Sequence, residues 1–163
     1  MIKTAILVID MINGMEQWIP KKNMLGLLPN IKKVLATAHA KKIPVIYVVH
    51  TPLGKKGTES YNEIKKTSFD YLITKKQYSA FFETNLEKLL KKLGVKKLIL
   101  IGVSTHWCIL STALDASYRG YEITLMQDCI AAPTKKWHNL AIKWMKDTFD
   151  IELTTSNSTN KFL

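Results

Sequence analysis

Residues 98–108 read LILIGVSTHWC, and this stretch decides the fold of the chain. A continuous apolar run is typical of a strand that is buried on both faces, and this one ends in small residues. Residues 109–119 then show the apolar spacing of a helix, which Gly120 ends. The stretch therefore predicts a strand, a tight turn and a helix, with Cys108 in or near the first helical turn.

Cys108 occupies a position where a thiol can be reactive. Unpaired backbone N–H groups and the positive end of the helix dipole stabilise an anion at such a site. We therefore expect a lowered thiol pKa, together with N–H donors ready for a developing oxyanion. By spacing alone, an inert buried cysteine at a strand-to-helix turn is an equal alternative.

Strands and helices alternate along the rest of the chain. Apolar runs of strand length occupy residues 4–10, 45–49, 71–74, 122–126 and 151–154, and helical spacing occupies residues 29–40, 84–93 and 134–150. Residues 51–70 include two glycines and several lysines, which predicts an exposed loop with at most one short helix. The alternation predicts an α/β fold of three α/β/α layers, with a single doubly wound, six-stranded, mainly parallel sheet. We expect one domain over residues 1–155 and a loose polar tail over residues 156–163.

Composition limits the class of protein. The 163 residues are 47% hydrophobic and include two cysteines, which form no C-x-x-C pair, so no disulfide framework is expected. Without a leader or a long apolar span, we expect a cytoplasmic protein that does not enter a membrane. The net charge of +11 comes from dispersed lysines, many in Lys-Lys pairs, with Arg119 as the single arginine. This pattern is typical of a solvated coat, so we expect no specific nucleic-acid binding.

Three polar residues follow predicted strands. Asp10 ends the first strand, Lys75 follows the third and Cys108 follows the fourth. The carboxyl ends of parallel strands meet at one edge of the sheet, where sites of this fold class lie. A carboxylate, an ammonium and a thiol in one crevice can perform nucleophilic acyl chemistry. Each residue also has a simpler interpretation, as a loop cap, a solvated lysine or a packed thiol.

The same segments resemble the isochorismatase-like cysteine hydrolases, a family that includes nicotinamidases and N-carbamoylsarcosine amidase. The resemblance covers residues 4–132 and rests on ILVIDM at 6–11, KKQYSAF at 75–81 and GVSTHWC at 102–108. It implies the isochorismatase-like hydrolase fold, with Asp10, Lys75 and Cys108 as a catalytic triad. It also implies a cis peptide before Ser104 and an oxyanion hole made of the backbone N–H groups of Ser104 and Cys108.

Departures from the family pattern concern the substrate. Nicotinamidases carry an Asp-x-His motif after the second strand and a further histidine in the next loop, which together hold a metal ion. Here residues 48–50 read VVH, and residues 51–74 contain no histidine. One imidazole is too few ligands for zinc, so we expect no metal and no cofactor. Ile12, Gly14 and Met15 also replace the usual Gln, Asp and Phe. Whether His50 instead faces the substrate is left open by the sequence.

The expected activity is metal-independent hydrolysis of a small amide or ureido compound through a thioester. The alternatives are a metal-assisted nicotinamidase and a catalytically silent member that binds a small ligand. True isochorismatases commonly carry glycine at the cysteine position, so Cys108 argues against vinyl ether cleavage. The candidate substrate-binding residues are Trp18, Tyr78, His106 and Trp107. We interpret Cys129 as an inert buried thiol and Asp128 as a loop or capping residue. Because relatives often form dimers or tetramers, a homo-oligomer, either a dimer or a tetramer, is also an open possibility for this chain.

Overall fold

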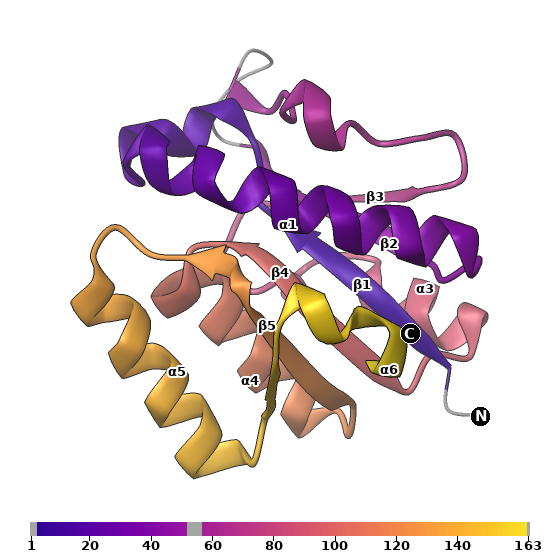
Figure 1. Ribbon diagram of the computed structural model, residues 1–163. Helices are drawn as coiled ribbons and strands as arrows, with labels where there is room; N and C mark the ends of the chain where they lie inside the picture. Colours follow the sequence, from indigo (N-terminus) through magenta and orange to yellow (C-terminus); the bar gives the residue numbers. More distant parts are fainter. Residues whose placement is uncertain (1–2, 52–56, 163) are drawn as a thin grey trace.

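A six-stranded parallel sheet forms the centre of the molecule, in the order β3-β2-β1-β4-β5-β6 (Figure 1). The computed structural model describes residues 3–51 and 57–162. Every strand pairs in parallel with its neighbours, which confirms the predicted doubly wound α/β fold. The strands are β1 (Thr4–Ile9), β2 (Val45–His50), β3 (Tyr71–Lys75), β4 (Lys97–Val103), β5 (Glu122–Ala131) and β6 (Glu152–Thr154).

Helices cover both faces of this sheet, and each face has its own apolar core. The main helices are α1 (Lys21–Ala40), α3 (Leu86–Leu93), α4 (Leu110–Tyr118) and α5 (Lys135–Phe149). α1 packs on one face, and α3, α4 and α5 contribute to the core on the other. Short helical turns are η1 (Asn13–Gln17), η3 (Asn62–Ile64), η4 (Thr105–Ile109), η5 (Ser156–Ser158) and α6 (Thr159–Phe162). No helix in the described ranges is long and apolar enough to cross a bilayer.

The strand order reverses direction between β1 and β4, since the chain builds outward from β1 to one edge and returns to start again at β4. A crevice opens at such a switch point beyond the carboxyl ends of the strands. All six residues of β1 are buried, as the uninterrupted apolar run of residues 4–9 predicts. This crevice is where the polar ends of β1, β3 and β4 meet.

Two boundaries differ from the sequence-based expectation. α1 begins at Lys21 instead of Pro29, so Pro29 lies inside the helix. The additional turns before Pro29 carry three buried side chains, those of Met24, Leu27 and Leu28. Packing on the sheet therefore outweighs the hydrogen bond that Pro29 cannot donate. β5 continues to Ala131 instead of ending at Met126, because the register between β4 and β5 shifts after Leu100, with the extra residues on β5, and Val103 then pairs with Ala131.

Threonine hydroxyls lie at the starts of α3 and α5. α3 begins at Leu86 instead of residue 84, and the Thr84 hydroxyl accepts a hydrogen bond from the Leu86 N–H at 3.2 Å. The Thr134 hydroxyl caps α5 by accepting a hydrogen bond from the Trp137 N–H. The helical spacing of residues 134–150 does not by itself identify the buried face of α5, since Leu140 and Trp144 are exposed while Ala141, Ile142 and Met145 are buried.

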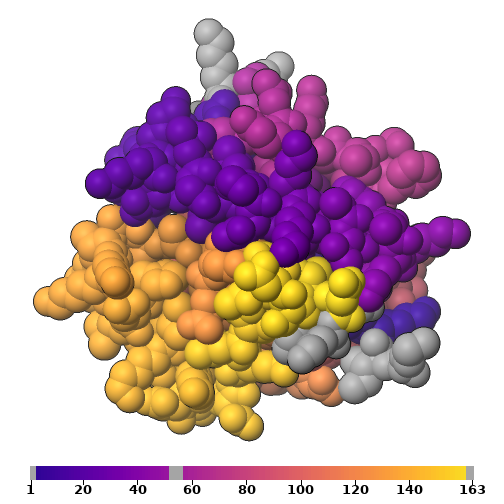
Figure 2. All heavy atoms as spheres, viewed as in Figure 1, coloured from indigo at the N-terminus to yellow at the C-terminus, as the bar shows by residue number. Residues whose placement is uncertain are grey.

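The C-terminal segment is packed, against the expectation of a loose tail. Ser156 and Thr159 are buried. Asp128 accepts hydrogen bonds from the Ser156 N–H at 2.8 Å and the Ser156 hydroxyl at 2.6 Å, so this carboxylate anchors the segment and is not a loop cap. In Figure 2 the C-terminal residues, in yellow, lie directly against α1.

Candidate functional site

Asp10 follows β1 at the floor of the crevice. Its side chain is fully buried, and its Oδ1 accepts a hydrogen bond from the His50 backbone N–H at 2.9 Å. Its backbone lies in the left-handed region with φ 51°, which costs about 1 kcal/mol or more in a non-glycine residue. β1 thus presents a carboxylate whose orientation the neighbouring strand β2 fixes.

Lys75 is the last residue of β3 and is also buried. Its Nζ lies 2.8 Å from Asp10 Oδ2, 3.1 Å from the Gln77 carbonyl oxygen and 3.3 Å from Cys108 Sγ. The three donors of the ammonium therefore have three partners. The structure brings Asp10, Lys75 and Cys108 together around one point, although they come from the end of β1, the end of β3 and the turn that follows β4.

Cys108 lies in η4, a single π-helical turn that precedes α4. The expected position was the first turn of a regular helix, so the turn is wider than predicted. The peptide bond between Val103 and Ser104 is cis. The Ser104 carbonyl accepts hydrogen bonds from the N–H groups of Trp107 and Ile109. This arrangement holds the turn closed around the Cys108 side chain.

The backbone at the end of β4 requires glycine at position 102. Gly102 has φ +113°, and a Cβ atom there would lie 2.0 Å from the Ile9 carbonyl oxygen. β1 and β4 therefore approach each other more closely than any side chain allows. The same close approach places the residues after Gly102 beside Asp10.

The electrostatic environment of Cys108 differs from the expectation. The pKa of the Cys108 thiol is raised to about 12, first by burial and second by the negative charge of Asp10, while Lys75 opposes both. The expected lowering of the thiol pKa is therefore wrong for the resting site. The thiol holds its proton at neutral pH, so a reaction at sulfur must begin with removal of that proton.

A cavity of about 180 Å³ opens above these residues. It is lined by Asp10, Met15, Trp18, His50, Tyr78, Trp107 and Cys108. Three of the four candidate substrate-binding residues, Trp18, Tyr78 and Trp107, thus lie in its wall. The rings of Tyr78 and Trp107 stack at 6.2 Å with an interplanar angle of 19°. Met15, which the sequence shows only as a departure from the family pattern, also lines this cavity from η1.

His106 does not line this cavity. Its ring stacks between Trp107 at 4.5 Å and Trp137 at 5.5 Å, and its Nδ1 lies 2.9 Å from the Ser104 hydroxyl. It borders a separate apolar hollow beside α5. Of the two positions open to His106, the pocket and the surface, the structure therefore places it outside the pocket, because neighbouring residues of a helical turn such as η4 point in different directions.

His50 enters the cavity wall from the end of β2. Its Nδ1 is buried and has no hydrogen-bond partner among the described residues. Its pKa is lowered first by burial and then by the positive charge of Lys75, with Asp10 opposing, so the ring is neutral at neutral pH. The described ranges contain no group of three His, Cys, Asp or Glu side chains that could hold a metal ion.

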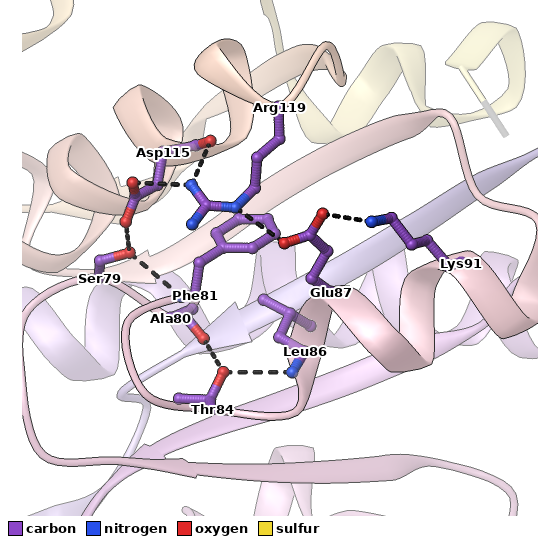
Figure 3. A network of polar contacts seen from close by, with 9 residues as sticks. All are labelled: Ser79, Ala80, Phe81, Thr84, Leu86, Glu87, Lys91, Asp115 and Arg119. Atoms are coloured by element: carbon purple, nitrogen blue, oxygen red, sulfur yellow. Dashed lines mark hydrogen bonds and ion pairs between the residues drawn. The ribbon is translucent and has the colours of Figure 1, made fainter.

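A polar network fixes the segment between Lys75 and α3 against α4 (Figure 3). The Ser79 hydroxyl donates to Asp115, and Arg119 pairs with both Asp115 and Glu87. The Arg119 guanidinium also lies 4.9 Å from the centre of the Phe81 ring. Phe81 is therefore a packing residue, and the network holds the segment that carries Tyr78 over the cavity.

Cys129 lies far from this chemistry. It is fully buried in β5, in the core that faces α1, whereas Cys108 belongs to the core on the other face. Burial raises the pKa of the Cys129 thiol, and the adjacent Asp128 adds to the effect. The structure thus separates the two cysteines by the sheet and leaves one of them beside the cavity.

Comparison with known proteins gives consistent matches over nearly the whole chain. The family described as Isochorismatase domain matches residues 4–158. An uncharacterised isochorismatase family protein of Bacillus subtilis, YaaI, is 31% identical over 93% of both chains. A "probable inactive nicotinamidase" of Arabidopsis thaliana is 33% identical over 88% of both. The structure of N-carbamoylsarcosine amidase from Thermoplasma acidophilum superposes with a TM-score of 0.86 and 28% identity, covering 96% of this chain and 98% of that one.

Proposed function

The chain belongs to the isochorismatase family, and from that premise we propose that it hydrolyses a small amide or ureido compound through a thioester on Cys108. One observation carries the proposal. Lys75 Nζ contacts both Asp10 Oδ2 and Cys108 Sγ at the floor of a cavity that admits a small planar molecule. A nucleophile, a base and a cation within reach of one carbonyl are the parts that acyl transfer needs.

In the first half of the reaction, the substrate carbonyl lies against Cys108 Sγ. Asp10 removes the thiol proton as sulfur adds to the carbonyl carbon, because the raised pKa leaves little free thiolate. The backbone N–H groups of Ser104 and Cys108 hold the resulting oxyanion, and one such donor contributes on the order of 3 kcal/mol. The C–N bond then breaks, and the proton held by Asp10 passes to the leaving nitrogen.

In the second half, water cleaves the thioester. Asp10 removes a proton from the water, and the hydroxyl adds to the acyl carbon. The C–S bond then breaks and the proton on Asp10 passes to sulfur, which restores the thiol and releases a carboxylic acid from an amide or a carbamic acid from a ureido compound. Lys75 remains positively charged throughout. Its role is to compensate the negative charge that moves between Asp10 and sulfur, both of which are buried, so that the surrounding solvent screens this charge only weakly.

The cavity limits the substrate. A volume of about 180 Å³ suits a small molecule, and the rings of Trp18, Tyr78 and Trp107 favour a planar one. His50 Nδ1 offers a further hydrogen bond to a polar group of the substrate. A substrate held by aromatic walls and by His50 needs no metal ion, which distinguishes this proposal from a metal-assisted nicotinamidase.

The test is a panel of amides assayed for ammonia or amine release. The panel contains nicotinamide, pyrazinamide, ureidoacrylate, carbamoylated amino acids and simple aliphatic amides, each with and without a chelator. We expect turnover that survives the chelator, is lost in Cys108→Ala and persists in the matched control Cys129→Ala. Lys75→Met should abolish turnover and Lys76→Met should not. Turnover that a chelator stops would overturn the metal-independent mechanism.

A second candidate is a silent family member that binds a small ligand in the same cavity. The raised pKa of Cys108 favours it, and one relative is itself named as an inactive nicotinamidase. Mass spectrometry of the protein mixed with each compound of the panel separates the two. An adduct on Cys108 that hydroxylamine removes supports hydrolysis, whereas binding of a panel compound without adduct or product supports the silent alternative.

A further inference from the structure

A side chain of α5 contacts the turn that carries the proposed oxyanion hole. Thr105, the first residue of η4, is completely buried, and its hydroxyl lies 3.0 Å from Nδ1 of His138. His138 belongs to α5 and follows Thr105 by 33 residues in the chain. A buried hydroxyl needs a hydrogen-bond partner. This contact therefore satisfies the Thr105 hydroxyl and at the same time ties η4 to a separate helix.

His138 is itself held in place near the start of α5. The Thr134 hydroxyl caps the helix by accepting the Trp137 N–H, and the Thr134 carbonyl oxygen accepts the His138 N–H at 3.1 Å. Burial lowers the pKa of His138, so its ring is neutral at neutral pH and carries one N–H and one acceptor nitrogen. A capped helical turn thus presents a fixed imidazole to the Thr105 hydroxyl.

Thr105 lies in the chain between the two N–H groups that are proposed to hold the oxyanion. The Ser104 carbonyl oxygen accepts the N–H groups of Trp107 and Ile109, both at 3.1 Å, but not that of Cys108, which lies between them. The π-helical turn thus spares the Cys108 N–H from this hydrogen bond. The directions of the Ser104 and Cys108 N–H groups depend on the backbone torsion angles between them. Thr105 is the first residue of that stretch, so its side chain restricts those angles.

His106 makes a similar contact with Ser104 but fixes the turn less well. Its Nδ1 lies 2.9 Å from the Ser104 hydroxyl, and the two residues are only two positions apart. A hydrogen bond within one short segment moves with that segment. The contact between Thr105 and His138, by contrast, fixes the turn relative to α5. The stacking of His106 on Trp137 is a second contact between the turn and the same helix.

We propose that His138 is a positioning residue for the oxyanion hole and acts through the Thr105 hydroxyl. Neither side chain lines the cavity, so neither contacts the substrate. Both act on where the Ser104 and Cys108 N–H groups point. A misdirected donor stabilises the tetrahedral intermediate less and leaves the cavity wall unchanged, so the chemical step slows while binding of the substrate persists. The inference rests on the proposed function, because it assigns a role in forming that intermediate.

The first test compares two reactions of Cys108. p-Nitrophenyl acetate acylates a thiol through a tetrahedral oxyanion and releases p-nitrophenolate, whereas iodoacetamide alkylates sulfur by direct displacement without an oxyanion. We expect Thr105→Val and His138→Leu each to slow acylation by about tenfold or more and to change alkylation by less than about twofold. Cys108→Ala gives the background rate at other nucleophiles. Equal changes in the two rates, or no acylation of the unaltered protein above that background, would overturn the proposal.

The second test restores the hydrogen bond. Thr105→Ser keeps the hydroxyl, and His138→Asn offers an amide group near the position of Nδ1, so both variants should acylate within about threefold of the unaltered rate. The double variant Thr105→Val/His138→Leu should be no slower than the slower single variant, since both substitutions remove the same contact. Losses that multiply in the double variant, or His138→Asn as slow as His138→Leu, would contradict a role through Thr105. Circular dichroism and urea unfolding check that every variant is folded.

The matched control removes a histidine hydrogen bond elsewhere. His39→Leu loses the contact with Asp70, which precedes β3 at the opposite end of the sheet from the crevice, and it should leave both rates unchanged. For any amide that is turned over, Thr105→Val should lower kcat by about tenfold or more and leave KM within about twofold. If acylation falls relative to alkylation but no amide is turned over, the proposed function fails and the positioning role stands. Turnover together with an unchanged ratio of the two rates would leave the function standing and overturn the positioning role.

Discussion

Lys75 Nζ lies 2.8 Å from Asp10 Oδ2, and both side chains are completely withdrawn from solvent. A buried ion pair adds little net stability, because removing two charges from water offsets most of their attraction. Substitution of only one of the two residues costs about 3–5 kcal/mol of stability, because the charge that remains is buried without a partner. This pair is therefore better explained by its proximity to Cys108 than by the stability of the fold.

Asp10→Asn should make Cys108 more reactive toward iodoacetamide while it abolishes hydrolysis. The substitution removes the negative charge that raises the thiol pKa and leaves the Lys75 ammonium 3.3 Å from sulfur in need of an anion. Asparagine can still accept the His50 N–H hydrogen bond. The measurement is the rate of alkylation at pH 7.5, with modified sites assigned by mass spectrometry.

Lys75→Met is the matched control for that experiment and should slow alkylation below the rate of the unaltered protein. Cys129 should remain unlabelled in all variants, because it is fully buried. For the unaltered protein, the raised pKa of Cys108 predicts labelling that increases steadily above pH 8, without a plateau near neutrality. Slower alkylation in Asp10→Asn would show that Asp10 does not control the thiol.

Gly102→Ala should destabilise the fold by at least about 3 kcal/mol or prevent folding. The added Cβ would meet the Ile9 carbonyl oxygen at 2.0 Å, and the backbone angle φ of +113° is unfavourable for alanine. The matched control is Gly26→Ala in α1, where nothing lies within 4 Å of the new Cβ, and it should stabilise by about 0.5–1 kcal/mol. Urea unfolding measures both, and equal effects would refute the close approach of β1 and β4.

Ser79→Ala should lower the free energy of unfolding by about 1–2 kcal/mol, because it removes the hydrogen bond from the Ser79 hydroxyl to Asp115. It should also raise KM severalfold with a smaller effect on kcat, since the loosened segment carries Tyr78 into the cavity wall. Lys91→Ala changes the same network at its exposed end, where solvent screens the ion pair with Glu87, and it should leave both the stability and KM nearly unchanged. A Ser79→Ala protein with unchanged KM would separate the network from the cavity.

Acidification should destabilise the fold as the pH falls below 6.5. Burial lowers the pKa values of His50, His106 and His138 from their ordinary value of 6.5. Below pH 6.5 the unfolded chain binds more protons at these residues than the folded chain, so the free energy of unfolding decreases with falling pH. Urea titrations from pH 7.5 to 5 measure the slope, and His138→Gln should reduce it. A slope unchanged by that substitution would contradict the contribution of His138.

Much of the fold can be predicted from apolar runs. Residues 5–9 and 98–101 are uniformly apolar, which is typical of strands at the centre of a parallel sheet that is covered on both faces. Helix boundaries were less predictable. Pro29 is normally a helix start, but the apolar contacts of the preceding turns placed it in the helix interior. The buried face of α5 could not be predicted from apolar residues alone, because Leu140 and Trp144 are as apolar as core residues and are nevertheless exposed.

For the candidate site too, part could be predicted from the sequence and part depended on the tertiary structure. The sequence by itself determined which side chains end the strands, Asp10, Lys75 and Cys108, because each follows an apolar run at a position that its neighbours fix. Only the tertiary structure decided the protonation of the thiol and the side on which His106 lies. Both depend on burial and on charges from other strands, and long-range contacts of this kind leave no periodic pattern along the chain.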